Sequence, residues 1–241
     1  MELIEKAAPS GSTGLGAVVG LFYEPGATFA RLDTRRSTWL PLLLILAANV
    51  ALVCWYFLGF VDYAWFQEQM LAAVSDPAQR EQQGAMAMSM QTMAGVTSFG
   101  LVFALLFSFA ISGVYFAIVS KVCNIDFKFG RGFALAVWAS VPLLLTLPLG
   151  AVQMMLGSAG QLPFEALNPL SLNQLVFQYG VTHPMSGILD SISVLLFWNL
   201  FLLIIGYQAW ANVKRATAAK IVVLPYIVIY GIWFAFALSR A

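Results

Sequence analysis

The sequence predicts an all-α, polytopic integral membrane protein: a bundle of five transmembrane helices with a short cytoplasmic amphipathic helix at the N-terminus. Three observations predict this fold. The 241-residue chain is 61% hydrophobic and only 10% charged, whereas a soluble domain carries about 25% charged residues. The apolar residues form five long runs, and the basic residues gather on one side of these runs. This composition excludes a soluble enzyme, a disordered chain and a secreted disulfide scaffold.

Residues 1–36 are expected to form a cytoplasmic N-terminal segment, followed by the transmembrane domain in residues 37–241. The segment combines apolar side chains with two adjacent arginines, and Pro25 suits the first turn of a helix. Such a segment is typical of a helix that lies on the inner membrane surface. The residues concerned are Leu21, Phe22, Phe29, Leu32, Arg35 and Arg36.

The five apolar runs each reach the length of about 20 residues that a helix needs to cross the hydrocarbon layer. They must be helical, because an open strand would leave backbone groups unpaired in lipid. None carries a charge in its middle, and Asp190 lies near the start of the fourth. Outer loops are expected at 62–93 and 157–187, the second with a short apolar stretch that lies flat or dips into the membrane. The runs are about Trp39–Phe60, Ala94–Val119, Phe133–Leu156, Ile188–Ala211 and Ile221–Leu238.

The distribution of basic residues predicts the orientation of the spans. Of the 12 Lys and Arg residues, all but Arg80 and Arg240 fall on the side of the N-terminus. Because cytoplasmic loops are enriched in Lys and Arg, the N-terminus is expected inside and the C-terminus outside. The residues on the N-terminal side are Lys6, Arg31, Arg35, Arg36, Lys121, Lys128, Arg131, Lys214, Arg215 and Lys220.

Several segments, taken in order, match a known pattern: Leu21–Leu32 leading into Trp39–Leu44, Phe133–Ala136 before Ser140–Leu143, Asp190–Ser193 before Phe197 and Trp198, Ile205–Tyr207, and Ala216–Lys220. In this order they resemble the Yip-one family of Ypt/Rab-GTPase-interacting proteins, in its bacterial form, and a bacterial cytoplasmic (inner) membrane is therefore the expected location. The resemblance covers roughly residues 20–236 and implies a five-helix bundle with a cytoplasmic N-terminus. Eukaryotic members are implicated in vesicle trafficking and bind Rab GTPases or one another through their membrane domains.

A group of methionines precedes the second run and faces the outer side. Thioether sulfur is a soft ligand that suits Cu(I), and Met86, Met90 and Met93 would share one face of a helix. Met88 would point away from that face. The alternative interpretation is that these residues are flexible apolar filler at the membrane entry of the helix.

Small residues recur at every fourth position of the second run: Gly100, Ala104, Ser108 and Ser112. Small side chains allow helix backbones to approach closely. This stripe therefore predicts a helix contact, either with another subunit or inside the bundle.

Polar side chains within the runs predict either hydrogen bonds between helices or a polar pocket, because unpaired amides are costly in lipid. Asn49, Gln153, Asn199 and Gln208 are the amides. Asp190 is expected to cap the fourth helix or to lie at the outer interface. Together with Trp198 and Asn199, it is a candidate for contacts made by that helix.

No catalytic constellation, cofactor motif or basic nucleic-acid patch is recognisable in the sequence, which favours a non-enzymatic protein without a cofactor. The first functional hypothesis is a membrane scaffold or adaptor, with the lipid bilayer and a homo-oligomer or another membrane protein as partners. The alternative is a transport component for lipid or a small apolar solute. Copper handling is a third. A solid bundle would favour the adaptor, and a lined cavity would favour transport.

Overall fold

The computed structural model describes residues 14–35, 37–72, 74, 76–85, 88–157 and 160–240. Within these ranges the chain is helical, with one isolated antiparallel bridge between Ser171 and Ser193. Five helical segments are long and apolar enough to cross a membrane, which confirms the predicted fold class. They are Trp39–Phe60, Met90–Val122, Phe129–Leu156, Val194–Ala211 and Arg215–Leu238.

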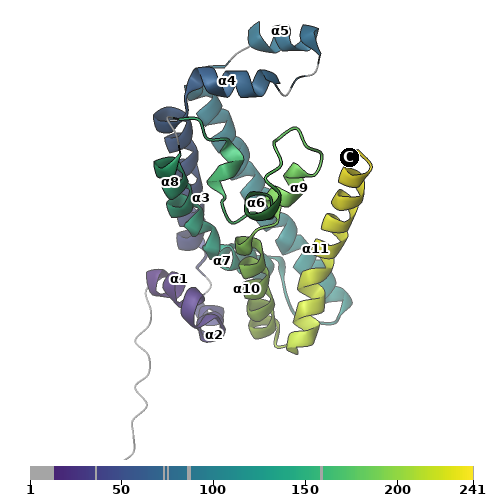
Figure 1. Cartoon of the computed structure of the whole chain (residues 1–241). Coiled ribbons are helices and arrows are strands. Elements are labelled where there is room, and N and C mark those ends of the chain that lie inside the picture. The colour runs from purple at the N-terminus through teal and green to yellow at the C-terminus, as the bar shows by residue number, and fades with distance from the viewer. Residues whose placement is uncertain are drawn as a thin grey trace, which may run out of the picture.

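Figure 1 shows these segments as a bundle, with the long helix α6 (Met90–Val122) running along it and α11 (Arg215–Leu238) at its edge. In the most apolar part of the third span 50% of the residues are buried. In the corresponding parts of α6 and α11 only 17% are buried. The third span therefore lies in the middle of the bundle. The other helices of the spans are α3 (Trp39–Trp55, extended by a π-helical turn at Tyr56–Phe60), α7 (Phe129–Ala139), α8 (Thr146–Leu156) and α10 (Val194–Ala211).

Two glycines form a close contact between α6 and α7. A Cβ atom placed on Gly132 would lie 3.0 Å from both the Cα and the carbonyl oxygen of Gly113. A Cβ on Gly113 would lie 3.2 Å from the backbone nitrogen of Phe133. The two backbones can approach this closely only because neither position carries a side chain.

The fourth span begins later than the sequence predicts, at Val194 instead of Ile188. The backbone leaves the helical conformation because residues 192–194 pair with a loop: Leu172 N donates to Ile192 O and Val194 N to Leu170 O. Ser193 is extended, and its side chain accepts a hydrogen bond from Leu196 N. Ser193 therefore caps α10, and Asp190 lies in the separate short helix α9 (Ser186–Ser191).

The expected N-terminal amphipathic helix consists of two helices, α1 (Gly14–Tyr23) and α2 (Pro25–Arg35), and Pro25 is the first residue of the second. Leu21 and Phe29 are fully buried in the main core, together with side chains of α6, α7, α10 and α11. The indole nitrogen of Trp210, on α10, donates to Phe29 O at 2.8 Å. The pair is thus anchored to the bundle.

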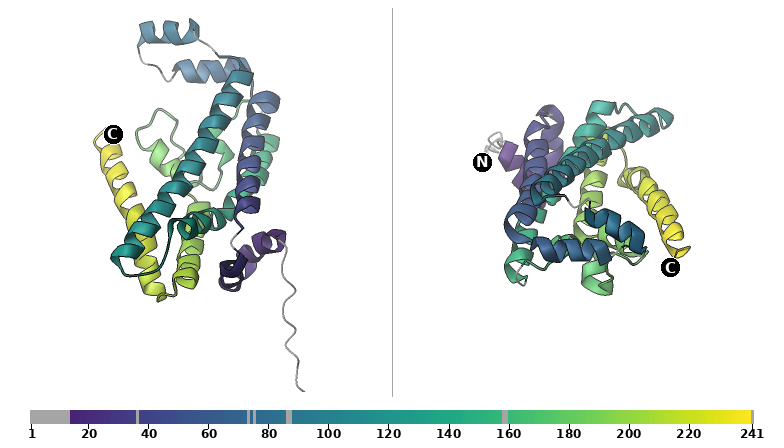
Figure 2. Two further views of the ribbon diagram at one scale, coloured as in Figure 1. Left: turned by 180° about the vertical axis from the view of Figure 1, so that it is seen from behind. Right: turned by 90° about the horizontal axis from the view of Figure 1, so that it is seen from above.

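Two further helices, α4 (Tyr63–Ala72) and α5 (Pro77–Ala85), occupy the expected outer loop. They project from the end of the bundle opposite α1 and α2 (Figures 1 and 2). Aspartates stabilise both helix starts, since Asp62 Oδ1 accepts from Trp65 N and Asp76 Oδ1 from Ala78 N. These local caps explain why this polar stretch is ordered as helices.

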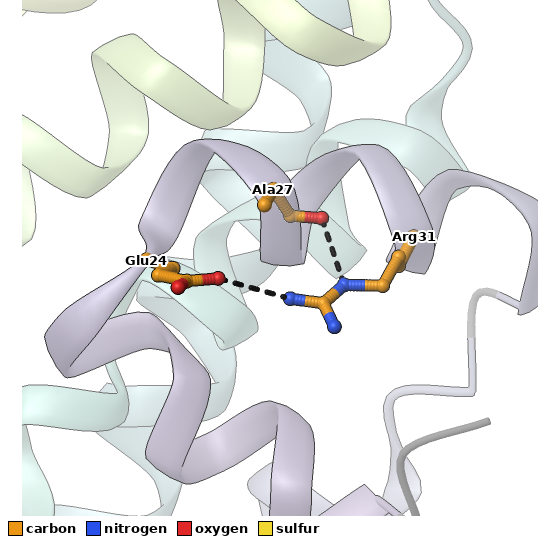
Figure 3. A network of polar contacts seen from close by, with 3 residues as sticks. All are labelled: Glu24, Ala27 and Arg31. Atoms are coloured by element: carbon orange, nitrogen blue, oxygen red, sulfur yellow. Dashed lines mark hydrogen bonds and ion pairs between the residues drawn. The ribbon is translucent and has the colours of Figure 1, made fainter. Parts of the chain in front are cut away.

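An ion pair bridges the corner between α1 and α2. Arg31 Nη2 lies 3.7 Å from Glu24 Oε2, and Arg31 Nε donates to Ala27 O at 3.1 Å (Figure 3). Both charged side chains are substantially exposed, at 43% for Arg31 and 71% for Glu24.

We expect Glu24→Gln to change stability by about 1 kcal/mol or less, because water and salt screen an exposed pair. Thermal unfolding in detergent at low and high salt measures this effect. A loss of several kcal/mol would contradict the prediction and would mean that the corner is held mainly by charge.

Candidate functional site

A partly open cavity of about 360 Å³ lies among α6, α7, α10 and α11. Ser108 and Ser112 line it from the middle of α6, and Tyr226 lines it from the middle of α11. The cavity therefore lies at the depth of the membrane-spanning segments. Leu105, Leu143 and other apolar side chains complete its walls.

The helices α6 and α11 diverge from one end of the bundle. Tyr115 OH donates to Ile221 O at 2.6 Å and joins the two helices near the ends that are closest to α2. Above this junction they lean apart, and α9 lies between them (Figure 2, left). The cavity occupies this divergence and includes residues of α9.

A break in the third span places a hydroxyl group in the cavity wall. Pro142 has no N–H group to continue the helix, and a 3-10 turn at Val141–Leu145 separates α7 from α8. Ser140, at the break, is buried, and its Oγ donates to Ala136 O at 2.9 Å. The Asn199 amide donates to the same Oγ at 3.1 Å. The wall thus couples α10 to the end of α7.

The wall formed by α9 and the preceding loop carries a carboxylate. Asp190 Oδ1 lies at the long hydrogen-bond distance of 3.4 Å from Ser171 Oγ, and Ser191 and Ser193 line the cavity beside it. Among the described residues that line the cavity, Asp190 is the one charged side chain. It has no Lys or Arg nitrogen within 4 Å in the described chain.

Asn168 lines the same wall and has an unsatisfied acceptor. Its side-chain oxygen is buried without a hydrogen-bond partner in the part of the chain that the structure describes. Its backbone oxygen accepts from Ser171 N at 3.1 Å, so this loop is tied to the segment that contacts Asp190. A buried carbonyl oxygen without a partner costs free energy that a ligand donor can recover.

Four of the candidate residues come together at this cavity: Ser108, Ser112, Asp190 and Asn199. Trp198 lies elsewhere and stacks on Phe22 of α1 at a ring distance of 6.3 Å.

The three remaining amides lie outside the lining, and Gln208 is partly buried on α10. Asn49, on α3, donates to Ile45 O at 2.8 Å. Its Oδ1 accepts from Thr146 Oγ1 at 3.4 Å, so Asn49 takes part in the contact between α3 and α8. Gln153 is partly buried on α8.

The small-residue stripe of α6 divides into two parts. Gly100 and Ala104 are exposed, and a Cβ on Gly100 would meet nothing within 4 Å. Ser108 and Ser112 instead line the cavity. Gly113 and Gly132 instead make the close contact between α6 and α7. Because these two glycines lie on different helices, a repeat within one helix does not reveal them.

The methionine group does not lie on one continuous helix. Met86 is outside the described residues, Met88 is non-helical and half exposed, and α6 begins at Met90. Met90 and Met93 are partly buried and pack against the core around Tyr56. Among the described residues, no group of three or more His, Cys, Asp or Glu side chains could hold a metal ion.

The sequence model of the Yip1 domain matches residues 19–237, which is nearly the whole chain. The chain belongs to the Yip1 family. No curated protein and no solved structure matches it. Two segments that carry the family resemblance, Ser140–Leu143 and Asp190–Ser193, contribute lining residues to the cavity. The cavity is therefore part of the Yip1 domain itself.

Proposed function

We propose that this Yip1 protein binds a lipid or similar amphiphile in the cavity among α6, α7, α10 and α11, as a non-enzymatic component of lipid transport. The observation that carries the proposal is a cavity with hydroxyl, amide and carboxylate groups at membrane depth. Polar groups inside a membrane domain are costly unless they have partners, and they commonly mark a ligand pathway.

The lining favours an amphipathic ligand over a purely apolar solute. Polar side chains from α6, α9 and α10 share the lining with leucines from α6 and α10, so the cavity offers both polar groups and apolar surface. The largely exposed α6 and α11 flank the cavity. We infer that a ligand enters from the bilayer between these helices and places its polar head against α9 and α10.

A cavity-filling variant tests this proposal. Ser112→Phe places a ring in the lined space, whereas Val114→Phe places one on an exposed face of the same helix. We expect Ser112→Phe to lower the lipid retained by the purified protein about tenfold, and Val114→Phe to leave it unchanged. Native mass spectrometry measures retention, and thermal unfolding verifies that both variants fold.

Proteoliposomes provide the second readout. Movement of labelled lipid between leaflets should exceed that of protein-free vesicles and should fall with Ser112→Phe. Equal retention by both variants, or retention of no lipid by the unchanged protein, would contradict lipid binding in the cavity. Binding without movement would restrict the role to lipid binding.

A second candidate is the scaffold or adaptor, supported by the exposed part of the α6 stripe. Gly100 and Ala104 offer a flat surface that the described chain leaves uncovered, and small residues suit close contact with a second membrane helix. Ala104→Trp should disrupt a homo-oligomer measured by mass photometry in mild detergent. A monomer that captures no membrane protein in a pull-down would count against this role.

We place the protein in a bacterial cytoplasmic membrane, with the N-terminus inside and the C-terminus outside. Basic residues at the C-terminal end of α6 and at the N-terminal ends of α7 and α11 support this orientation. Labelling of single cysteines introduced at Ala78 and at Lys214 from either side of the membrane tests it. Modification at Ala78 alone by an impermeant reagent in intact cells is the expected result.

A further inference from the structure

We infer that the head group bound in the cavity carries a primary ammonium, which sits at the wall formed by Asp190 and Asn168. This inference rests on the proposed function and specifies the ligand of the same site. The ligand chemistry is an amine with N–H donors, supplied either by an ethanolamine lipid or by a free amine.

Charge is the first argument. Asp190 is the one charged side chain among the described lining residues, and no Lys or Arg nitrogen lies within 4 Å of it in the described structure. A carboxylate in a medium of low dielectric attracts a cation strongly. An anionic head group would meet this charge with no cationic side chain in the described lining to offset it.

The hydrogen-bonding state of the wall is the second argument. The hydroxyl hydrogens of Ser140 and Ser191 are committed to backbone oxygens, those of Ala136 and Ile188. The Ser191 oxygen can therefore only accept a bond from a ligand, and the Ser140 oxygen, which already accepts from the Asn199 amide, has one lone pair left to accept another. Asn168 Oδ1 is a further acceptor, buried and without a partner in the described chain. The wall thus offers several acceptors.

A primary ammonium matches such a wall because it carries one positive charge and three donors. A quaternary ammonium carries the charge but lacks the N–H donors. The hydroxyls of Ser108 and Ser112, on the α6 side of the cavity, are donors available to the phosphate of an ethanolamine lipid.

The test compares lipids with identical acyl chains and different heads on the purified full chain. Native mass spectrometry measures the affinity for phosphatidylethanolamine, phosphatidylcholine and phosphatidylglycerol. We expect the ethanolamine lipid to bind about tenfold more tightly than the glycerol lipid, with the choline lipid between them. Free ethanolamine, added as a competitor, distinguishes the two sources. If it displaces the lipid when both are at the same concentration, the site belongs to a free amine; if it does not, the site belongs to the ethanolamine lipid.

Matched variants connect this preference to the wall. Asp190→Asn keeps the shape of the side chain and removes its charge, and it should abolish the preference for ethanolamine. Asn168→Asp adds a carboxylate and should increase that preference. Asp126→Asn removes an exposed carboxylate in the loop between α6 and α7, outside the cavity lining, and should change nothing. Thermal unfolding establishes that each variant folds.

The outcomes separate the two proposals. If the unchanged protein binds the ethanolamine and glycerol lipids equally, or if Asp190→Asn retains the preference, the ammonium assignment is overturned while lipid binding stands. If Ser112→Phe does not reduce binding of any lipid, the cavity is not the binding site and both proposals fail.

Discussion

Gly132→Leu is expected to separate α6 from α7 and to destabilise the bundle by about 3 kcal/mol or more. A Cβ at this position would lie 3.0 Å from the backbone of Gly113, and backbone cannot move aside as the end of a flexible side chain can. Overpacking of a tight site costs about 1–3 kcal/mol and occasionally more, and a leucine brings further atoms into the same crossing. Unfolding in mixed micelles, followed by circular dichroism, measures the loss.

Gly130→Leu is the matched control, two residues away on the same helix. A Cβ on Gly130 would meet nothing within 4 Å. Leucine is the better helix former by nearly 1 kcal/mol, so the control is expected to be neutral or slightly stabilising. Equal stability of the two variants would show that the α6–α7 crossing does not need the glycine pair.

Trp210→Ala should detach α1 and α2 from the bundle and cost about 3–5 kcal/mol. The Trp210 side chain is buried, its ring meets Phe29 edge-on at 5.7 Å, and its N–H bonds Phe29 O. Removing it leaves a void and takes the indole donor away from Phe29 O. Hydrogen exchange in residues 14–35, together with thermal unfolding, measures both effects.

Two further variants resolve this loss into its parts. Trp210→Phe removes mainly the hydrogen bond and should cost about 1 kcal/mol. Trp233→Ala, at a half-exposed tryptophan of α11, should leave exchange in α1 and α2 unchanged. Exchange that is equally slow in Trp210→Ala and in the unchanged protein would contradict the anchoring role.

The spans were largely predictable because their signal is local. The run Trp39–Phe60 has the same bounds in the sequence and in the structure. The start of the fourth span was wrong because apolar residues continue through Ile188–Leu189, and composition does not reveal that residues 192–194 pair with the loop at Leu170–Leu172. Such pairing depends on segments about 20 residues apart.

The cavity could be predicted only in fragments. Ser108, Ser112, Asp190 and Asn199 were each notable as polar or small residues near apolar runs, but their meeting depends on how α6, α9 and α10 pack. Asn168 gave no signal, because a polar residue before proline in a loop is ordinary. The Ser140-Val141-Pro142 sequence was the available clue to Ser140, since proline interrupts a helix beside a hydroxyl group.

The length of α6 links the cavity to the thickness of the bilayer. At 33 residues, α6 is about 50 Å long, well beyond a hydrocarbon layer of about 30 Å. A helix of this length fits the layer when it is tilted, and in Figure 2 (left) α6 runs at a slant to α3. A long helix adjusts to a thicker bilayer by tilting less. Because α6 and α11 are joined at one end by Tyr115 and diverge from there, a more upright α6 would change the angle between them. The width of the cavity entrance should accordingly vary with the acyl-chain length of the surrounding lipid.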